Sequence, residues 1–564
     1  MTQRTGGQIL VDALHTHGTD LVFGVPGESY LAVLDALHDS AIRFIVNRQE
    51  GGAAFMAEAY GKLTGRPGVC FVTRGPGATN ASIGVHTAHQ DSTPMILFIG
   101  QVGNDFVERE AFQEIDYRRM FGTMTKWVAQ IDRADRIPEY VAHAYQVATS
   151  GRPGPVVLAL PEDMLTAQAD VPDARRYQPV QAAPSPAQIT QLRDMLAAAK
   201  QPVVMLGGAG WNTDACNDIR LFAERNALPV ACAFRFQDLL DNRHAHYIGD
   251  VGIGINPKLA ARIKSADLVI AIGPRLGEMT TGGYTLLDAP VPKQKLVHVH
   301  ASAEELGRVY QADLMINSGM PQIAAALAGM APVEASAWRH TVAEARAELA
   351  AWQEEPPIFK GSDAALNLWQ VVQTLKAALP PDTILTNGAG NFATWAHRFW
   401  HYGGFRTQLA PTSGAMGYGV PAAVAAKIAA PHRTVLNFAG DGDFMMNGQE
   451  LATAVQHRAG VLFIVFNNGA YGTIRMHQER EYPGRVSGTA LQNPDFAALA
   501  QAYGAFGESV ETTARFPLAL ERAQRHIAAS GLPALIELRY DADFITPNAS
   551  LATIRQASLA ARSR

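Results

Sequence analysis

Short apolar runs recur along the whole chain and alternate with stretches in which apolar positions return every three or four residues. Such runs, rich in Val, Ile, Leu and Phe, are typical of strands buried in a parallel sheet, and the longer period is typical of amphipathic helices. Strands in regular alternation with helices predict an α/β protein with helices on both faces of each sheet. The predicted strands begin at Leu21, Phe44, Gly68, Met95, Pro202, Pro229, Leu268, Leu296, Thr383, Val435, Leu462 and Ala534.

Two segments rich in Ala, Pro and charge interrupt this pattern, at residues 166–187 and 331–363, and the second contains a polar helix at about 336–353. A chain of 564 residues is too long for one core. We therefore predict three consecutive doubly wound parallel-sheet domains and a short tail. Their expected ranges are residues 1–170, 188–332, 362–545 and 546–564.

The composition narrows the class of protein. The net charge of −5 gives no electrostatic case for binding nucleic acid or an anionic membrane. The three cysteines, Cys70, Cys216 and Cys232, lack zinc-site spacing and fit a reducing compartment. The N-terminus lacks the apolar core of a signal peptide, and no apolar run is long enough to span a membrane. We expect a cytoplasmic protein.

Asp441 and Asn468 lie in Gly-Asp-Gly and Asn-Asn-Gly sequences, each at the end of a predicted buried strand. Each motif alone is also typical of a plain turn. Neighbouring parallel strands, however, bring both side chains to the carboxyl edge of one sheet, where open α/β folds bind ligands. A carboxylate, an amide oxygen and a nearby carbonyl suit Mg²⁺, and the glycines let the backbone approach a diphosphate.

Glu50 follows a predicted strand and opens an Ala-rich helix that begins Glu-Gly-Gly-Ala-Ala. One interpretation is a carboxylate stabilised by the positive end of the helix dipole. The alternative is a carboxylate that exchanges a proton with a cofactor, for which its apolar setting would be suitable. Local sequence alone does not decide between these interpretations.

A family resemblance links the two ends of the chain. The Gly-Asp-Gly…Asn-Asn arrangement resembles the thiamine-diphosphate signature. The first domain resembles that of acetolactate synthase (acetohydroxyacid synthase) and its relatives among the thiamine-diphosphate-dependent decarboxylases and carboligases. The matching motifs are Arg48-x-Glu-Gly-Gly-Ala-Ala-Phe-Met-Ala-Glu-Ala-Tyr-Gly61, Gly75-Pro-Gly-Ala-Thr-Asn80, Asp91-Ser-Thr-Pro94, Gly100-Gln-Val102 and Ala111-Phe-Gln-Glu114.

This resemblance implies a pyrimidine-binding, a middle and a diphosphate-binding domain, in that order. It also implies a homodimer or homotetramer in which Glu50 of one chain faces Asp441 of another. Glu50 and Gln113 would be catalytic, and Asp441, Asn468 and the Ala470 carbonyl would hold Mg²⁺. The implied cofactor-binding residues are Gly27, Glu50, Thr79, Asn391, Gly414, Met416, Gly442, Asp443, Tyr471 and Gly472. Met416 would bend the cofactor, because its thioether suits such a wedge.

The chain departs from that family around the substrate. Thr473 and His477 stand where the family has a methionine and a tryptophan, so the acceptor pocket is expected to be more polar. Arg275 survives at a position linked to the acceptor carboxylate, although a surface ion pair is an alternative interpretation. Phe112 is a further candidate substrate contact. In the middle domain, Gly207-Gly-Ala-Gly210 could meet a diphosphate, but His298 and His300 replace the family's acidic strand end. FAD is left open.

The predicted reaction is decarboxylation of a small 2-oxo acid, such as pyruvate, and ligation of the resulting carbanion to a second 2-oxo acid or aldehyde. A non-ligating decarboxylase or a flavin-linked oxidase on the same fold is the alternative. A dinucleotide-dependent dehydrogenase is disfavoured, because we find no intact Gly-x-Gly-x-x-Gly loop. A catalytically silent cofactor-binding protein is a fourth possibility, which substitution of Glu50 distinguishes.

Overall fold

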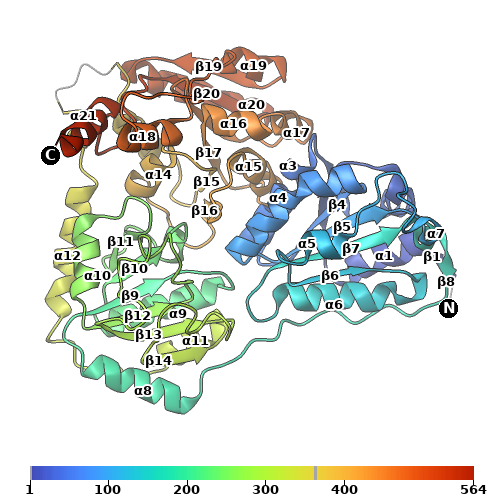
Figure 1. The fold of residues 1–564 in the computed structure, drawn as a ribbon, viewed down its shortest axis with the longest axis horizontal. Coiled ribbons are helices and arrows are strands. Elements are labelled where there is room, and N and C mark those ends of the chain that lie inside the picture. The colour runs from blue at the N-terminus through green and yellow to red at the C-terminus, as the bar shows by residue number, and fades with distance from the viewer. Residues whose placement is uncertain (1–2, 361–364, 564) are drawn as a thin grey trace. The chain divides into compact units, whose positions relative to one another are not determined.

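The computed structural model describes residues 3–360 and 365–563, and the chain divides into two compact units, Met1–Ala182 and Ala183–Arg564. The first unit is built on a six-stranded sheet in the order β3-β2-β4-β5-β7-β6, in which every pair of neighbours is parallel. Figure 1 labels β4, β5, β6 and β7 of this sheet. Its strands are β2 (Leu21–Gly24), β3 (Arg43–Val46), β4 (Gly68–Val72), β5 (Met95–Gln101), β6 (Trp127–Gln130) and β7 (Pro155–Pro161).

Helices cover the first sheet because its strand residues are apolar on both sides. One face packs Val69, Phe71, Ile96 and Phe98 against α1 and α6. Two short strands, β1 (Arg4–Thr5) and β8 (Gln168–Ala169), pair antiparallel. The helices of this unit are α1 (Gly6–Thr16), α2 (Leu31–His38), α3 (Glu50–Thr64), α4 (Gly75–Asp91), α5 (Tyr117–Phe121), α6 (Ile137–Thr149) and α7 (Glu162–Thr166).

The second unit contains two further six-stranded parallel sheets. The middle sheet has the order β11-β10-β9-β12-β13-β14, and successive residues of its strands enter two different cores: Val204 and Ile270 on one face, Val203 and Val269 on the other. That alternation is the direct mark of a doubly wound sheet. The strands are β9 (Pro202–Leu206), β10 (Val230–Ala233), β11 (Tyr247–Val251), β12 (Leu268–Ile272), β13 (Lys295–His300) and β14 (Leu314–Asn317); the helices are α8 (Pro186–Ala197), α9 (Thr213–Arg225), α10 (Pro257–Ser265), α11 (Met320–Ala328) and α12 (Arg339–Trp352).

The third sheet has the order β16-β15-β17-β18-β20-β19. The chain leaves β15 for the edge strand β16 and returns to β17 on the other side, so β15 and β17 flank a topological switch point. The strands are β15 (Ile384–Asn387), β16 (Gln408–Leu409), β17 (Val435–Gly440), β18 (Leu462–Asn467), β19 (Phe506–Val510) and β20 (Ala534–Arg539). The helices are α13 (Leu368–Ala378), α14 (Ala393–Phe399), α15 (Gly419–Ala429), α16 (Asp441–Asn447), α17 (Glu450–Gln456), α18 (Gly472–Glu481), α19 (Phe496–Ala502), α20 (Phe516–Ser530) and α21 (Leu551–Arg562).

The predicted fold class is confirmed, and every strand predicted from the sequence is present. The segment interpreted as a linker before the third domain differs in one respect: it includes Trp338, which is buried with its indole N–H donating to the Asn226 carbonyl at 3.0 Å. The predicted tail is largely the helix α21. The exact domain boundaries stay a prediction.

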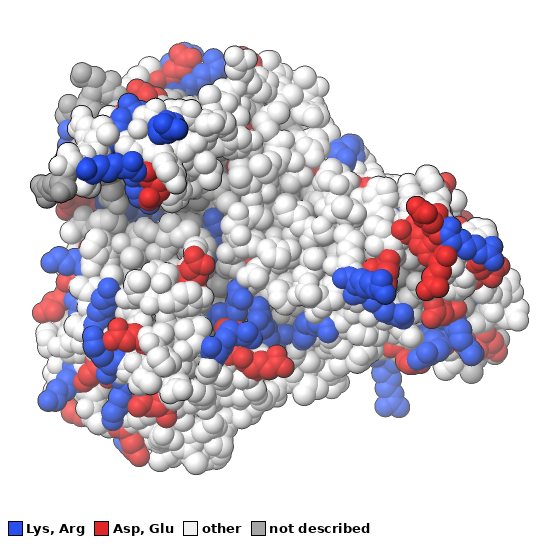
Figure 2. Space-filling model, viewed as in Figure 1, with Lys and Arg blue, Asp and Glu red and all other residues white. Residues whose placement is uncertain are grey.

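Charged side chains of both signs are mixed on the face seen in Figure 2. This mixture is in keeping with the small net charge of the chain. Within the described residues, no helix combines the length and the apolar character needed to cross a membrane.

Candidate functional site

A pocket lies at the carboxyl edge of the third sheet, where the loops after β15, β17 and β18 converge beside the switch point. It gathers, from separate parts of the sequence, most of the third-domain residues for which the sequence predicts a cofactor or metal role. Its lining residues include Asn391, Gly414, Met416, Asp441, Gly442, Asp443, Asn468, Ala470, Tyr471, Gly472 and Thr473.

Asp441 is the first residue of α16, directly after β17, and is buried. Its carboxylate accepts from its neighbour Gly442 N at 2.9 Å, from Ala470 N at 3.2 Å and from Asn493 Nδ2 at 2.8 Å. Burial raises the pKa of this carboxyl, and these donors act in the opposite direction. The carboxylate is therefore held in one orientation, facing the pocket that Asn468 and Ala470 also line.

Asn493 lies outside the residues that the sequence singled out. Its side-chain amide donates both to Asp441 Oδ2 and to Asn467 Oδ1, the second at 2.9 Å. Asn467 Nδ2 in turn donates to the buried Glu537 carboxylate at 2.6 Å. A chain of hydrogen bonds thus fixes the Asn-Asn turn and the Asp441 carboxylate together, in the way that outer-shell groups orient metal ligands. No signal in the sequence marks Asn493.

Asp443 is also buried and lies in the first turn of α16. Its Oδ1 accepts from Ala389 N at 3.1 Å and from Gly417 N at 2.8 Å, so the carboxyl joins the loop after β15 to the loop that carries Met416. Burial raises the pKa of Asp443 to about 7. Gly388 is required beside it, because a Cβ there would lie 2.0 Å from Asp443 Oδ1.

The loop of residues 413–418 brings Gly414 and Met416 to the pocket wall. Gly414 has a left-handed φ of +67°, and a Cβ placed on it would meet open space, so the backbone conformation accounts for the glycine. Asn447 Nδ2 donates to the Gly417 carbonyl at 2.9 Å and holds the far end of the loop. The loop is therefore fixed by α16 at both Asp443 and Asn447.

Thr473 and His477, the predicted acceptor-pocket pair, lie differently on α18. Thr473 lines the pocket, and its hydroxyl donates to Asn391 Oδ1 at 3.0 Å. Asn391 Nδ2 donates to Met476 Sδ at 3.5 Å, so Met476 shares this face of the helix. His477 is exposed and is not among the residues that line the pocket.

Arg275 follows β12 in the middle sheet, is partly buried, and does not line this pocket. At the same sheet edge, buried His298 donates through Nε2 to the Pro274 carbonyl at 3.0 Å, and the buried His300 Nδ1 accepts from Ser302 N at 3.0 Å. These imidazoles are engaged with the backbone and supply no carboxylate for a ribose at the end of β13. Binding of FAD stays open, and no step is assigned to a flavin.

In the first unit, Glu50 is the first residue of α3, directly after Gln49, whose side chain caps the helix by accepting from Gly52 N at 3.0 Å. The Glu50 carboxylate accepts from Asn80 Nδ2 at 2.9 Å. Glu50 also lies close to Gly77, where an added Cβ would be 3.6 Å from its Oε1. The structure thus joins two of the predicted motifs, those of Glu50 and of Gly75–Asn80.

The other predicted residues of this unit lie around the same strand ends. A Cβ on Gly27 would lie 2.6 Å from the Thr73 Cβ, which explains the glycine there. Thr79 is exposed on α4, and its hydroxyl donates to the Gly75 carbonyl at 2.7 Å. The Gln113 carbonyl accepts from Gly75 N at 2.9 Å, and Gln113 has a left-handed φ of +65°. Phe112 beside it is 70 % exposed.

Comparison with known families matches all three parts of the chain. Residues 4–120 match the N-terminal TPP binding domain of the thiamine pyrophosphate enzymes, residues 189–327 their central domain, and residues 388–538 their C-terminal TPP binding domain. The chain belongs to the thiamine pyrophosphate enzyme family. The predicted thiamine-diphosphate dependence is thereby confirmed, and with it the assignment of the chain as an enzyme.

Among curated relatives, this thiamine pyrophosphate enzyme is similar to acetolactate synthase large subunits. The one from Corynebacterium glutamicum is 33% identical over 92% of this chain and 84% of its own length. The isozyme 2 large subunit from Escherichia coli K12 is 31% identical, covering 92% of both chains. A probable acetolactate synthase large subunit from Methanocaldococcus jannaschii is 31% identical over 88% of this chain and 86% of its own length. The predicted resemblance to acetolactate synthase is confirmed.

Among the described residues, no cluster of three or more His, Cys, Asp or Glu side chains could hold a metal ion. The predicted Mg²⁺ ligands do not need such a cluster, because they are one carboxylate, one side-chain amide and one backbone carbonyl. Asp441, Asn468 and Ala470 all line the same pocket. This oxygen-rich set fits a hard cation that keeps part of its water and takes phosphate oxygens.

Proposed function

We propose that this enzyme decarboxylates a small 2-oxo acid such as pyruvate and ligates the remaining acyl unit to a second 2-oxo acid or aldehyde, in the manner of acetolactate synthase. The observation that carries the proposal is the pocket at the switch point of the third sheet. It brings Asp441, Asn468 and Ala470 together with Gly414 and Met416. The relatives named as acetolactate synthases support the reaction type.

In this proposal the third-sheet pocket binds the diphosphate end of the cofactor through Mg²⁺. Asp441, Asn468 and the Ala470 carbonyl hold the metal. Gly442 and Gly472 are both in the pocket wall. A larger residue would not fit at either position, because an added Cβ would lie within 2.7 Å of a neighbouring side chain. Asn391, Asp443 and Tyr471 complete the wall.

When bound, thiamine diphosphate would supply a nucleophilic carbon and a thiazolium ring able to accept the electron pair left by loss of CO₂. Glu50 holds a proton at N1′ of the pyrimidine, and Asn80 orients the Glu50 carboxylate. Met416, which lines the pocket, would present its thioether to the cofactor. Gly27 and Thr79 contact the pyrimidine end, and Gln113, Phe112 and Arg275 are candidate substrate contacts. Thr473 bounds the acceptor side.

The proposed active site combines Glu50 of one chain with Asp441 of another, so a homodimer or homotetramer is required. The family resemblance supports this assembly, and size-exclusion chromatography with light scattering tests it. A cytoplasmic location stays a prediction.

Product analysis tests the reaction. The purified enzyme is incubated with pyruvate, Mg²⁺ and thiamine diphosphate in aerated phosphate buffer, which supplies the phosphate and O₂ that an oxidase would need. CO₂ is quantified beside acetolactate, acetaldehyde, acetyl phosphate and peroxide. We expect one CO₂ for each acetolactate. Acetaldehyde and CO₂ without acetolactate overturn ligation in favour of simple decarboxylation, and acetyl phosphate with peroxide indicates an oxidase.

Removal of the metal tests the Mg²⁺ requirement. Dialysis against EDTA is expected to abolish turnover, and added Mg²⁺ is expected to restore it.

A further inference from the structure

The segment after β10, residues 234–243, connects the middle sheet to the third sheet within the second unit. The Asp238 carboxylate accepts from Thr407 N at 3.1 Å and from Gln408 N at 3.3 Å, at the edge strand β16. Asn242 Oδ1 accepts from Tyr402 N at 3.0 Å. This segment therefore covers an edge that would otherwise leave backbone groups unpaired.

Arg235 is the residue of this segment that reaches the cofactor loops. Its guanidinium is buried and donates through Nη2 to the Gly388 carbonyl at 2.9 Å and through Nη1 to the Pro411 carbonyl. Gly388 opens the loop after β15, which lines the pocket from Ala389 to Phe392. Pro411 opens the loop after β16, which carries Gly414 and Met416. One side chain from the middle domain thus bridges both loops.

The two carbonyls also have donors within their own loops. Gly388 O accepts from Asn387 Nδ2 at 2.8 Å, and Pro411 O accepts from Gly414 N at 3.0 Å. These bonds stabilise each loop separately. Arg235 joins the two loops to each other by donating to one carbonyl in each. Asp443 also joins them, by accepting from Ala389 N and Gly417 N.

The backbone of Arg235 adds an independent observation. Its φ is +64°, a left-handed conformation that is costly for a residue with a long side chain. Such conformations persist where the surroundings over-determine them, and they cluster at functional sites. Arg235 also lies over the Phe234 ring, with its Cζ 4.9 Å from the centroid. The arginine is held in this orientation by its backbone, its ring contact and its two carbonyl acceptors.

We propose that Arg235 is a positioning residue for the cofactor site: it sets the separation of the Gly388–Phe392 and Pro411–Met416 loops from outside the third domain. The inference rests on the proposed placement of thiamine diphosphate in this pocket. The guanidinium is suited to the task because its planar fork donates to two acceptors at once, whereas a lysine ammonium is a single point donor. Without Arg235, Asp443 alone would join the two loops, so the cofactor would have to order them further on binding and its affinity would fall.

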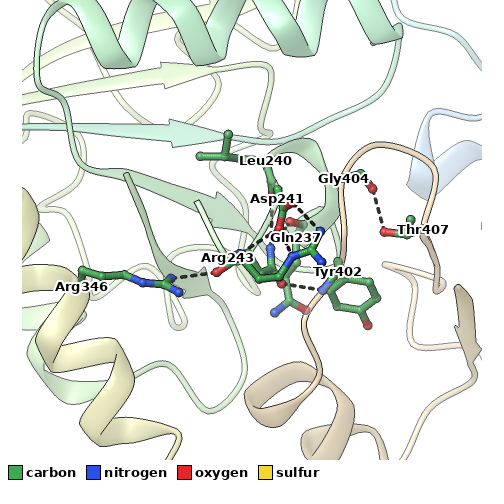
Figure 3. Close-up of polar contacts among 9 residues, drawn as sticks. Gln237, Leu240, Asp241, Arg243, Arg346, Tyr402, Gly404 and Thr407 are labelled. Atoms are coloured by element: carbon green, nitrogen blue, oxygen red, sulfur yellow. Dashed lines mark hydrogen bonds and ion pairs between the residues drawn. The ribbon is translucent and has the colours of Figure 1, made fainter. Parts of the chain in front are cut away.

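The test compares Arg235→Asn and Arg235→Lys with the control Arg243→Ala. Asparagine tolerates a left-handed backbone, so this variant removes the guanidinium without adding strain. Arg243 lies on the same segment, but its side-chain hydrogen bonds go to Asp241, as Figure 3 shows. Thiamine diphosphate is titrated into each metal-loaded apoprotein by calorimetry, without substrate, and the kcat and KM for pyruvate are then measured at saturating cofactor.

We expect Arg235→Asn to raise the Kd for thiamine diphosphate by at least about tenfold, with Arg235→Lys intermediate and Arg243→Ala unchanged. Guanidinium chloride at low millimolar concentration should restore affinity to Arg235→Asn and leave the control unaffected. The KM for pyruvate at saturating cofactor should stay within about twofold of wild type, because Arg235 is not among the residues that line the pocket.

The proposal is overturned if Arg235→Asn and Arg235→Lys bind the cofactor as tightly as Arg243→Ala. If Arg235→Asn does not fold, Arg235→Lys decides the test. The proposal is then overturned if Arg235→Lys has an unchanged melting temperature and binds thiamine diphosphate within about twofold of the affinity of Arg243→Ala. The proposed reaction is judged separately. A wild-type enzyme that binds the cofactor but forms no acetolactate overturns ligation and leaves the role of Arg235 standing.

Discussion

The side-chain amide of Asn493 lies 2.8 Å from the carboxylate of Asp441 and donates to it, although the two residues are distant in sequence. The same amide donates to Asn467, so Asn493 holds the two halves of the proposed metal site at a fixed separation. Outer-shell partners of this kind orient ligating carboxylates and typically change metal affinity by about 10–100-fold when removed.

Replacement of Asn493 should therefore weaken metal binding more than folding. We expect Asn493→Ala to raise the Kd for Mg²⁺ by about tenfold or more, measured by calorimetry in the presence of thiamine diphosphate. Gln492→Ala is the matched control, because Gln492 is the exposed preceding residue. Equal Mg²⁺ affinities in the two variants would show that Asn493 does not support the site.

Glu50 is predicted to act on the cofactor rather than to hold it. We expect Glu50→Gln to lower kcat by about 10²- to 10⁴-fold, the usual range for a lost acid–base group, because the amide cannot exchange a proton at N1′. The Kd for thiamine diphosphate should change only a few-fold. Steady-state acetolactate formation and calorimetry measure the two quantities. Glu139→Gln, which removes an exposed carboxylate paired with Arg136, serves as the control. Turnover by Glu50→Gln within a few-fold of wild type would exclude this mechanism.

Thr473 and His477 are both predicted to shape the acceptor pocket, but they differ in whether they line the pocket of the third sheet. Thr473 lines the pocket and bonds to Asn391, whereas His477 is exposed. We expect Thr473→Ala to change the ratio of products from competing pyruvate and 2-oxobutyrate acceptors by about threefold or more, a difference of order 1 kcal/mol at the pocket wall. His477→Ala should leave that ratio within about twofold. A larger effect at His477 than at Thr473 would place the acceptor elsewhere.

The sequence predicts those parts of the protein whose signal is local. Central strands such as β17 and β18 are buried and mostly apolar, and Asp441 and Asn468 stand in short motifs directly after them. The edge strand β16 is only Gln408–Leu409, so its pairing is decided by the loops around it and not by its own residues. The strand β7 is apolar, but it begins at Pro155 and ends at Pro161, and prolines in a sequence are typical of loops.

The missed site residues act through partners that carry no sequence signal. Arg235 donates to two backbone carbonyls, Gly388 and Pro411, which any residue could offer. Asn493 is placed by the path of a loop, and nothing around it in the sequence distinguishes it from a turn asparagine. His477 stands one turn beyond Thr473 on α18 and is exposed, whereas Thr473 and Met476 contact Asn391, so a role for His477 at the acceptor stays a prediction.

Glu479 joins α18 to the helix α21. Its side chain is fully buried and accepts from Arg555 Nε at 2.8 Å and Nη2 at 2.6 Å, with Arg475 Nη2 at 2.5 Å. The bidentate bond from Arg555 lowers the pKa of Glu479 to about 2. Because α18 carries Thr473, this ion pair connects α21 to the helix that bounds the pocket.

A carboxyl whose pKa is lower in the folded state stabilises that state fully above its unfolded value, near 4.5, and loses the contribution as the pH falls toward about 2. Allowing for the solvent exposure of Arg555, we expect about 2 kcal/mol at neutral pH. In Glu479→Gln, the amides of α21 should therefore exchange with deuterium about tenfold or more faster than in wild type at pH 7.

The ratio of variant to wild-type exchange rates at each pH cancels the intrinsic pH dependence of exchange. This ratio should stay constant from pH 7 to about 5 and shrink toward one as the pH falls below the unfolded value of the carboxyl. Glu521→Gln, which removes an exposed pair with Arg525 on α20, should show a ratio near one throughout. A ratio for Glu479→Gln that does not change with pH would mean that α21 is held by packing and not by the charge on Glu479.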